Sequence, residues 1–399
     1  MGPATLDAAQ AKARAAARVD ELAEALVAAS HDIHARPELA YEEHFAAGRL
    51  ADLVEVQGIA VERGAFGLPT AFVARVGERG PNVVICCEYD ALPGIGHGCG
   101  HNIIGTAGVG AGLAAAAVAD AVGGRVTILG TPAEEGGGGK IRLLAAGAFD
   151  GADVAMMVHP EAGDVERVPY LANDSLVVEM HGVAAHAASS PWAGVNALDA
   201  LVLGYTAVNA LRHRLRPDEK VFGIITHGGD ATNVLPAYAA AKYRVRAATS
   251  AGLDELRRKV VACFEGAAQQ TGARLEYRFE GGYEDMASNR TLAAAYRRNG
   301  EALGRRFVDP ALIPVSVAGS TDMGNVSKVL PSIHPVIGMC PITVGGHTIE
   351  MAEHSVTPAA DRAVVDGAKA MAMTAIDVWT DPDLLGAARA EFERFVVDR

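Results

Sequence analysis

Residues 81–90, PNVVICCEYD, form a continuous apolar run with several β-branched residues, and the run ends in two acidic side chains. Such runs are typical of strands that are buried on both faces of a parallel sheet. The pattern returns in RVTILGTPAEE (125–135) and ADVAMMVHP (152–160). Helical stretches are expected between these runs, at about 103–120 and 139–147. The alternation of strand and helix predicts an α/β layered domain.

Each of these three strands ends on side chains that can bind a metal or move a proton. The first ends at Glu88 and Asp90, the second at Glu134 and Glu135, and the third at His159. In open α/β sheets, sites assemble at the carboxyl ends of the strands. The sequence therefore predicts a functional site at one edge of the sheet.

After about residue 172 the pattern changes. SLVVEMH and KYRVRA alternate apolar with polar residues, as strands do in a sheet that is exposed on one face. Helices are expected at about 194–212 and 251–271. We therefore predict that an inserted domain spans 173–285. The main domain is then divided into a first part, 1–172, and a second part, 286–399.

Composition excludes several classes of protein. A net charge of −13 over 399 residues argues against a nucleic-acid partner, because binding phosphates requires a basic surface. The apolar stretch 107–124 is interrupted by Asp120 and is expected to be an internal helix, so no membrane association is predicted. The five cysteines are an odd number, and reduced thiols are expected. No signal-peptide pattern opens the sequence, and we expect a cytoplasmic protein.

The loop GIGHGCGH, residues 94–101, carries a thiol and two imidazoles among four glycines. Cys99 and His101 are two residues apart and can address one metal, although such a pair is often incidental. His97 could also reach the metal or could simply form hydrogen bonds within the loop.

Adjacent glutamates occur in TPAEEGGGGK, residues 131–140. Consecutive side chains diverge, so one of Glu134 and Glu135 can bind a metal while the other acts as general acid and base. The alternative is a solvated acidic pair at the start of a helix.

Further imidazoles are found in VHP, as His159, and in GGHTIEMAEH (345–354), as His347 and His354. Thiol, imidazole and carboxylate donors suit zinc or manganese better than calcium. Five such donors exceed a single tetrahedral site and predict two divalent ions.

Several motifs together resemble the M20 family of metallopeptidases, most closely its amidohydrolase branch. They are EYDALPGIGHGCGHN (88–102), TPAEEGGGGK, HGVAAHAASSPWAGVNALDA (181–200), and GSTDMGNVS (319–327) with PSIHP (331–335). The resemblance implies an α/β fold, with a three-layer αβα zinc-peptidase-like catalytic domain. Its insert would be a ferredoxin-like α+β lid that also forms a homodimer.

The resemblance also implies the roles of the site residues. Glu134 would be the general base, and Asp90 would orient a metal ligand without binding the metal itself. Many family members have a histidine where this chain has Glu88, and we interpret the thiol as part of its replacement. The implied ligands of two Zn²⁺ or Mn²⁺ ions are Cys99, His101, Glu135, His159 and His347.

In the lid, the resemblance implies that His186 reaches the active site of the partner subunit and stabilises the oxyanion. Asn233 and Arg246 would bind a free carboxylate of the substrate, although the arginine could simply belong to the polar face of its strand. Ser320 and Thr321 would line the substrate pocket.

The implied activity is hydrolysis of an amide bond in a dipeptide or N-acyl amino acid. One alternative is an N-carbamoyl or aryl-amide hydrolase of the aminobenzoyl-glutamate type. Two others are an inactive partner subunit of a hetero-oligomer and a metal-storage or metal-sensing protein.

Overall fold

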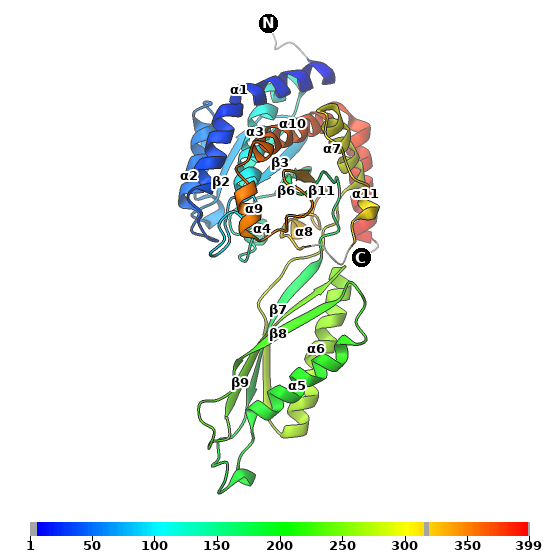
Figure 1. Ribbon diagram of the computed structural model, residues 1–399. Helices are drawn as coiled ribbons and strands as arrows, with labels where there is room; N and C mark the ends of the chain where they lie inside the picture. The colour runs from blue at the N-terminus through cyan, green and yellow to red at the C-terminus, as the bar shows by residue number, and fades with distance from the viewer. Residues whose placement is uncertain (1–5, 315–318, 398–399) are drawn as a thin grey trace. The chain divides into compact units, whose positions relative to one another are not determined.

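The computed structural model describes residues 6–314 and 319–397 (Figure 1). The chain forms two compact units. The first combines the chain up to Val168 with Ala287–Ile313 and the chain from Asn325 onward, and the second combines Pro169–Met286 with Pro314–Gly324. Our predicted boundaries gave this last segment to the first unit. Leu171 N donates to Gly319 O at 2.8 Å, and this backbone bond ties the segment to the second unit.

The first unit contains a mixed six-stranded sheet. The three strands predicted from the apolar runs are adjacent and parallel, in the order β4 (Arg125–Gly130), β3 (Asn82–Cys87) and β5 (Val154–Met156). On one side of these three strands, β2 (Phe72–Val76) pairs antiparallel with β4, and β1 (Val61–Arg63) pairs antiparallel with β2. On the other side, β11 (Ser332–Ile333) pairs parallel with β5. The full order is β1 (Val61–Arg63), β2 (Phe72–Val76), β4 (Arg125–Gly130), β3 (Asn82–Cys87), β5 (Val154–Met156) and β11 (Ser332–Ile333). A separate parallel pair joins β6 (His159–Glu161) to β12 (Val336–Gly338).

Helix α3 (His101–Val122) is the central helix of this unit and packs against β3, β4, α1 (Ala8–His34) and α10 (Pro358–Thr380). It approaches the sheet closely because its glycines lack side chains. A Cβ at Gly108 would lie 2.6 Å from Cys87 Sγ, which is closer than carbon and sulfur can approach. Among the described residues, α3 alone is long and apolar enough to span a membrane, and 89% of its most apolar window is buried inside the protein. The expectation of an internal helix is met.

Six further α-helices lie in the described residues outside Pro169–Met286. They are α2 (His44–Glu55), α4 (Gly139–Ala145), α7 (Arg290–Ala302), α8 (Met323–Val326), α9 (Ile349–His354) and α11 (Pro382–Val397).

The second unit is an antiparallel four-stranded sheet covered on one face by two helices. The strand order is β10 (Arg274–Phe279), β7 (Ala172–His181), β9 (Tyr238–Ala247) and β8 (Lys220–His227). The helices are α5 (Ala197–Arg212) and α6 (Ser250–Thr271). Apolar side chains at alternate positions of β7 and β9 are buried in one core with side chains of both helices. The alternation read from the sequence therefore predicted this sheet correctly.

Candidate metal centre

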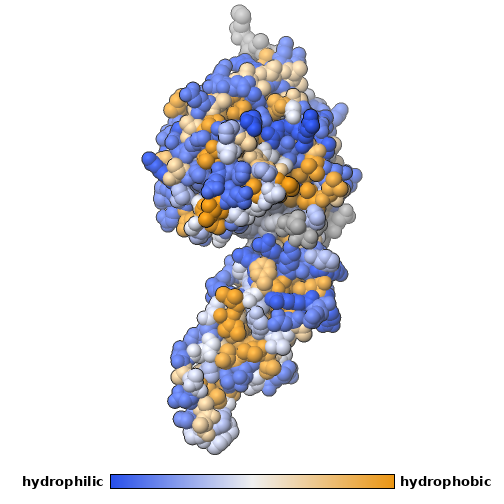
Figure 2. Space-filling view, viewed as in Figure 1, coloured by the Kyte–Doolittle hydropathy of each residue, from blue (hydrophilic) through white to orange (hydrophobic). Residues whose placement is uncertain are grey.

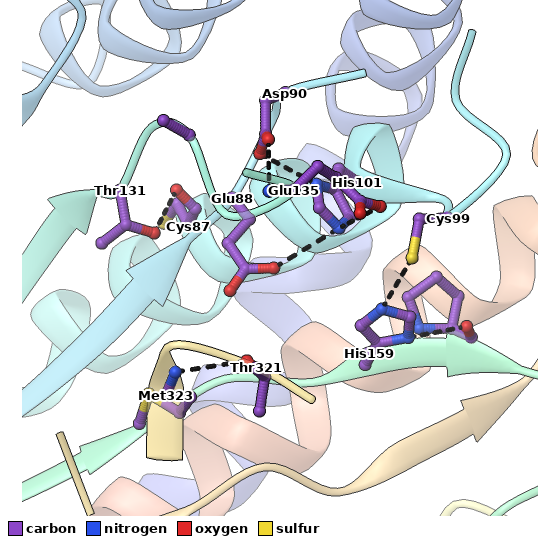
Figure 3. Close-up of polar contacts among 12 residues, drawn as sticks. Cys87, Glu88, Asp90, Cys99, His101, Thr131, Glu135, His159, Thr321 and Met323 are labelled. Atoms are coloured by element: carbon purple, nitrogen blue, oxygen red, sulfur yellow. Dashed lines mark hydrogen bonds and ion pairs between the residues drawn. The ribbon is translucent and has the colours of Figure 1, made fainter. Parts of the chain in front are cut away.

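The carboxyl end of β3 supplies the first acidic groups of the site. Asp90 is buried and accepts two hydrogen bonds, from His101 Nδ1 at 3.0 Å and from the backbone N of Glu135 at 2.9 Å (Figure 3). Burial acts to raise the pKa of Asp90, but the charge and hydrogen bond of His101 hold it below its usual range. One carboxylate thus holds the His101 side chain and the Glu135 backbone, which lie in different segments.

His101 is the first residue of α3 and follows Gly100, whose φ of 71° lies in the left-handed region that glycine adopts freely. Because Nδ1 donates to Asp90, Nε2 carries the lone pair of the neutral ring. Burial acts to lower the pKa of His101, but Asp90 and Cys99 raise it well above its usual value. Surroundings that favour a proton on this ring also favour a metal ion beside it.

Glu134 and Glu135 lie in the turn that follows β4. The preceding residue, Ala133, has a φ of 60°, which is uncommon outside glycine. Its backbone N donates to Glu43 Oε1 at 2.8 Å, so a fully buried carboxylate holds this turn. Glu135 is largely buried and also faces His347. Burial acts to raise its pKa, but His347 and His101 outweigh burial and lower it.

Cys99 and His159 point toward one another from different elements (Figure 3). The distance from Cys99 Sγ to His159 Nε2 is 3.4 Å. Burial raises the pKa of the Cys99 thiol well above its usual value and lowers the pKa of His159. Both groups are therefore held in uncharged forms unless a cation replaces the proton of the thiol.

His347 completes the set. Its φ of 61° is again left-handed, and its backbone N donates to Gly98 O at 2.8 Å, which joins the two glycine-rich loops. His347 Nε2 lies 3.3 Å from Glu135 Oε1, and its side chain is 57% exposed. The hydrogen bond to Glu135 raises the pKa of His347. This imidazole is the most accessible member of the cluster.

The structure thus brings together the five predicted ligands and the predicted general base. Their donor atoms fall into three groups, each with all atoms within 4.8 Å of one another. The groups are Cys99–His101–His159, Cys99–Glu135–His347 and His101–Glu134–Glu135.

The chemistry of these donors fits divalent cations. His101 Nε2 is buried and has no hydrogen-bond partner among the described residues. Its nearest ionisable oxygens belong to Glu88 at 3.7 Å and Glu135 at 3.8 Å. Carboxylate oxygens around this nitrogen favour a cation there, either a proton on the ring or a metal ion in its place. The three donor groups share residues, and together they offer enough donor atoms for two ions.

Three buried residues near the cluster had no assigned role from the sequence. Lys140 contacts Glu88, the His334 ring lies 5.5 Å from that of His159, and Glu43 holds Ala133. No periodicity in the sequence marks them, because each acts through contacts between distant segments. Of the two histidines whose role stayed open, His97 is buried, and neither of its ring nitrogens has a hydrogen-bond partner among the described residues. His354 is the last residue of α9 and belongs to none of the donor groups.

The other predicted site residues belong to the second unit. His186 and Asn233 are exposed and lie on neighbouring loops, since Ala187 N donates to Asn233 O at 2.9 Å. Arg246 is half-buried, and its Nε has no hydrogen-bond partner among the described residues. Burial lowers the pKa of Arg246, and the neighbouring Arg244 adds to this effect.

Ser320 and Thr321 lie in the segment Pro314–Gly324. Thr321 is buried, and its Oγ1 accepts a hydrogen bond from Met323 N at 3.2 Å. Their suggested place in the substrate pocket stays a prediction.

Comparison with known proteins places this site in a family. Residues 173–272 match the model of a peptidase dimerisation domain of the M20 type. The chain is 43% identical to a mouse (Mus musculus) Xaa-Arg dipeptidase and 39% identical to the human (Homo sapiens) one. Each alignment covers 96% of this chain and 92% of the relative. The chain belongs to the M20 family of metallopeptidases. It is therefore a metal-dependent hydrolase of amide bonds, and the predicted resemblance is confirmed.

Other M20 relatives agree with this assignment. A p-aminobenzoyl-glutamate hydrolase component from Escherichia coli (strain K12) is 30% identical, with 90% of each chain covered. A dinuclear metal-binding M20 peptidase from Bacillus subtilis has a TM-score of 0.67 at 19% identity, over 90% of this chain and 99% of that one. The predicted fold, an αβα catalytic domain with an inserted dimerisation domain, is confirmed.

Proposed function

We propose that this M20 enzyme is a dipeptidase that releases a C-terminal basic residue, as in Xaa-Arg. The observation that carries the proposal is the cluster of thiol, imidazole and carboxylate donors beside Glu134, in which only His347 is exposed. The substrate class is supported by two relatives named Xaa-Arg dipeptidases, at 43% and 39% identity.

Two divalent ions are proposed as cofactors. Cys99, His101, His159, Glu135 and His347 would hold them. The thiol favours zinc over manganese. When bound, such ions polarise the scissile carbonyl and lower the pKa of water.

Glu134 is proposed as the proton carrier of the reaction. Its side chain is buried beside His101 and Glu135, where it can take a proton from the attacking water and return it to the leaving nitrogen. Asp90 fixes the position of both His101 and the Glu135 backbone, so it maintains the site without touching substrate.

His186 is proposed as the oxyanion donor. Its Nδ1 accepts hydrogen bonds from the backbone N–H groups of Ala188 and Ser189, both at 3.2 Å. The proton of the neutral ring is then on Nε2, which is free to donate.

We propose separate binding groups for the α-carboxylate and for the basic side chain of the substrate. Arg246, together with Asn233, would bind the α-carboxylate, because its guanidinium Nε has no protein acceptor among the described residues. Glu161 would bind the basic side chain. It is half-buried in β6, and it forms no ion pair among the described residues. Its charge acts to raise the pKa of His347 and opposes the larger effect of burial, which lowers the pKa of His159. Glu161→Gln should raise KM for Ala-Arg about tenfold and leave KM for Ala-Ala unchanged.

The second unit is proposed to form a homodimer. Hydrophobic side chains gather on its visible face (Figure 2), and edge strand β8 exposes Phe222, Ile224 and Ile225. Ile224→Glu should convert a dimer to a monomer in analytical ultracentrifugation. A cytoplasmic location is proposed from the five free cysteines, and cell fractionation tests it.

The first experiment measures metal per subunit by mass spectrometry, with hydrolysis assayed before and after chelation. The substrates are Ala-Arg, Ala-Lys, Ala-Glu, an N-acetyl amino acid and p-aminobenzoyl-glutamate. About two ions per subunit, with activity on Ala-Arg lost on chelation and restored by metal, is the expected result. Preferred cleavage of p-aminobenzoyl-glutamate would favour the second candidate, which rests on the 30% identical hydrolase component. Failure to bind metal would contradict both.

A further inference from the structure

A buried ion pair adjoins the predicted ligands. Lys140 and Glu88 are fully buried, and Lys140 Nζ contacts Glu88 Oε1. Glu88 follows β3, and Lys140 lies in the first turn of α4, after the glycine run that begins at Gly136. Buried ion pairs contribute little to stability, because both charges lose their hydration. This pair therefore invites a functional explanation.

The second oxygen of Glu88 points to that function. Oε2 is buried, has no hydrogen-bond partner among the described residues, and lies 3.7 Å from His101 Nε2. His101 Nε2 is itself buried without a hydrogen-bond partner in the described parts of the chain. Two ligands that are each about 2.1 Å from one ion lie roughly 3–4 Å apart. The separation of these two atoms is therefore that of two ligands sharing a cation.

Charge balance agrees with this geometry. With Cys99 as thiolate, the cluster has five negative groups, namely Glu88, Asp90, Cys99, Glu134 and Glu135. The ammonium of Lys140 cancels one of these charges, and the remaining four equal the charge of two divalent ions. Without Lys140, a fifth buried acid would be uncompensated.

We propose that Glu88 is a further ligand of the ion bound by His101, and that Lys140 is its fixed counter-ion. Glu88 Oε2 faces the ion, while Oε1 is held by the ammonium group. Lys140 therefore acts as a positioning residue. This inference rests on the metal centre proposed above and adds one carboxylate to it.

The test compares Zn²⁺ affinities, by chelator competition, of the full-length protein and the variants Glu88→Gln, Lys140→Met and Glu88→Gln/Lys140→Met. The matched control is Glu166→Gln, which alters another buried glutamate of the first unit, one paired with Arg297. In Glu88→Gln, one ion should bind about 10- to 100-fold more weakly, and the control should be unchanged. Glu88→Gln leaves the buried Lys140 without its carboxylate, and the double variant removes both charges. The double variant therefore still gives a Zn²⁺ affinity if Glu88→Gln fails to fold.

The double variant shows whether Glu88 binds the metal or only forms a structural ion pair with Lys140. If Glu88 is a ligand, removing Lys140 as well does not restore the lost affinity. The visible spectrum of the Co²⁺-loaded protein should also change in both Glu88 variants. Wild-type affinity in Glu88→Gln, or its recovery in the double variant, would overturn the proposal. Failure of the wild-type protein to bind two ions would instead overturn the proposed function.

Discussion

The polar residues of the first unit differ from those of the second in burial and in partners. Asp90, His101 and Glu134 are buried, and Asp90 and His101 are joined by a hydrogen bond. In the second unit, His186 and Asn233 are exposed. Buried charges interact strongly because water does not screen them, so the first set suits tightly bound ions. Exposed donors remain available for a substrate. Variants of the first unit should therefore affect metal or chemistry, and those of the second should leave metal content unchanged.

The largest effect is expected for Glu134→Gln. The amide cannot carry the proton, so kcat should fall on the order of 10³–10⁴-fold. Metal content should stay at the wild-type value, because all of the proposed ligands remain. Steady-state kinetics and mass spectrometry of the same sample check both points. Glu353→Gln, an exposed glutamate of α9, is the matched control. Normal turnover in metal-loaded Glu134→Gln would exclude the proposed role.

His186→Ala tests the second unit directly. Loss of one oxyanion donor should lower kcat about 10²–10³-fold, while metal content and melting temperature should stay unchanged because the side chain is exposed. The control is His213→Ala, another exposed histidine of this unit. Loss of metal in His186→Ala would contradict the proposal that only residues of the first unit bind the ions.

Arg246→Met should act on binding. Without the guanidinium, KM for Ala-Arg should rise about 10- to 100-fold, and kcat should change little. Lys242→Met alters an exposed cation on the same face of β9 and should leave KM unchanged. The C-terminal amide of Ala-Arg should be cleaved equally by wild type and Arg246→Met. If Arg246→Met raised KM for the amide as much as for Ala-Arg, the arginine would not be the group that binds the carboxylate.

The smallest effect is the pH dependence of metal affinity. Burial raises the pKa of the Cys99 thiol, so at neutral pH the thiol is protonated and metal binding must release that proton. Affinity should therefore fall as pH falls, about tenfold per pH unit for each proton released. Calorimetry in buffers of different ionisation enthalpy counts the protons. Cys99→Ser should release fewer protons on metal binding than wild type, and Cys263→Ser should release the same number. Affinity independent of pH would contradict a thiolate ligand.

Much of the fold could be read from local patterns. The apolar run at 81–90 became the buried parallel strand β3, and the alternation in KYRVRA became half-covered β9. Both follow from which side chains avoid water, a property of each segment by itself. The place of Pro314–Gly324 in the second unit could not be read this way, because its contacts, among them the bond from Leu171 N to Gly319 O, join residues far apart in the chain.

For the site, the sequence by itself determined the donor types and their place at strand ends and glycine-rich turns. Only the tertiary structure decided which donors meet. It brings Cys99 to His159 and His347 to Glu135, across loops far apart in the chain. It also paired Glu88 with Lys140, which no spacing predicts. The physical reason is that hydrophobic patterning is local, whereas the energy of a buried charge depends on the groups that folding places around it.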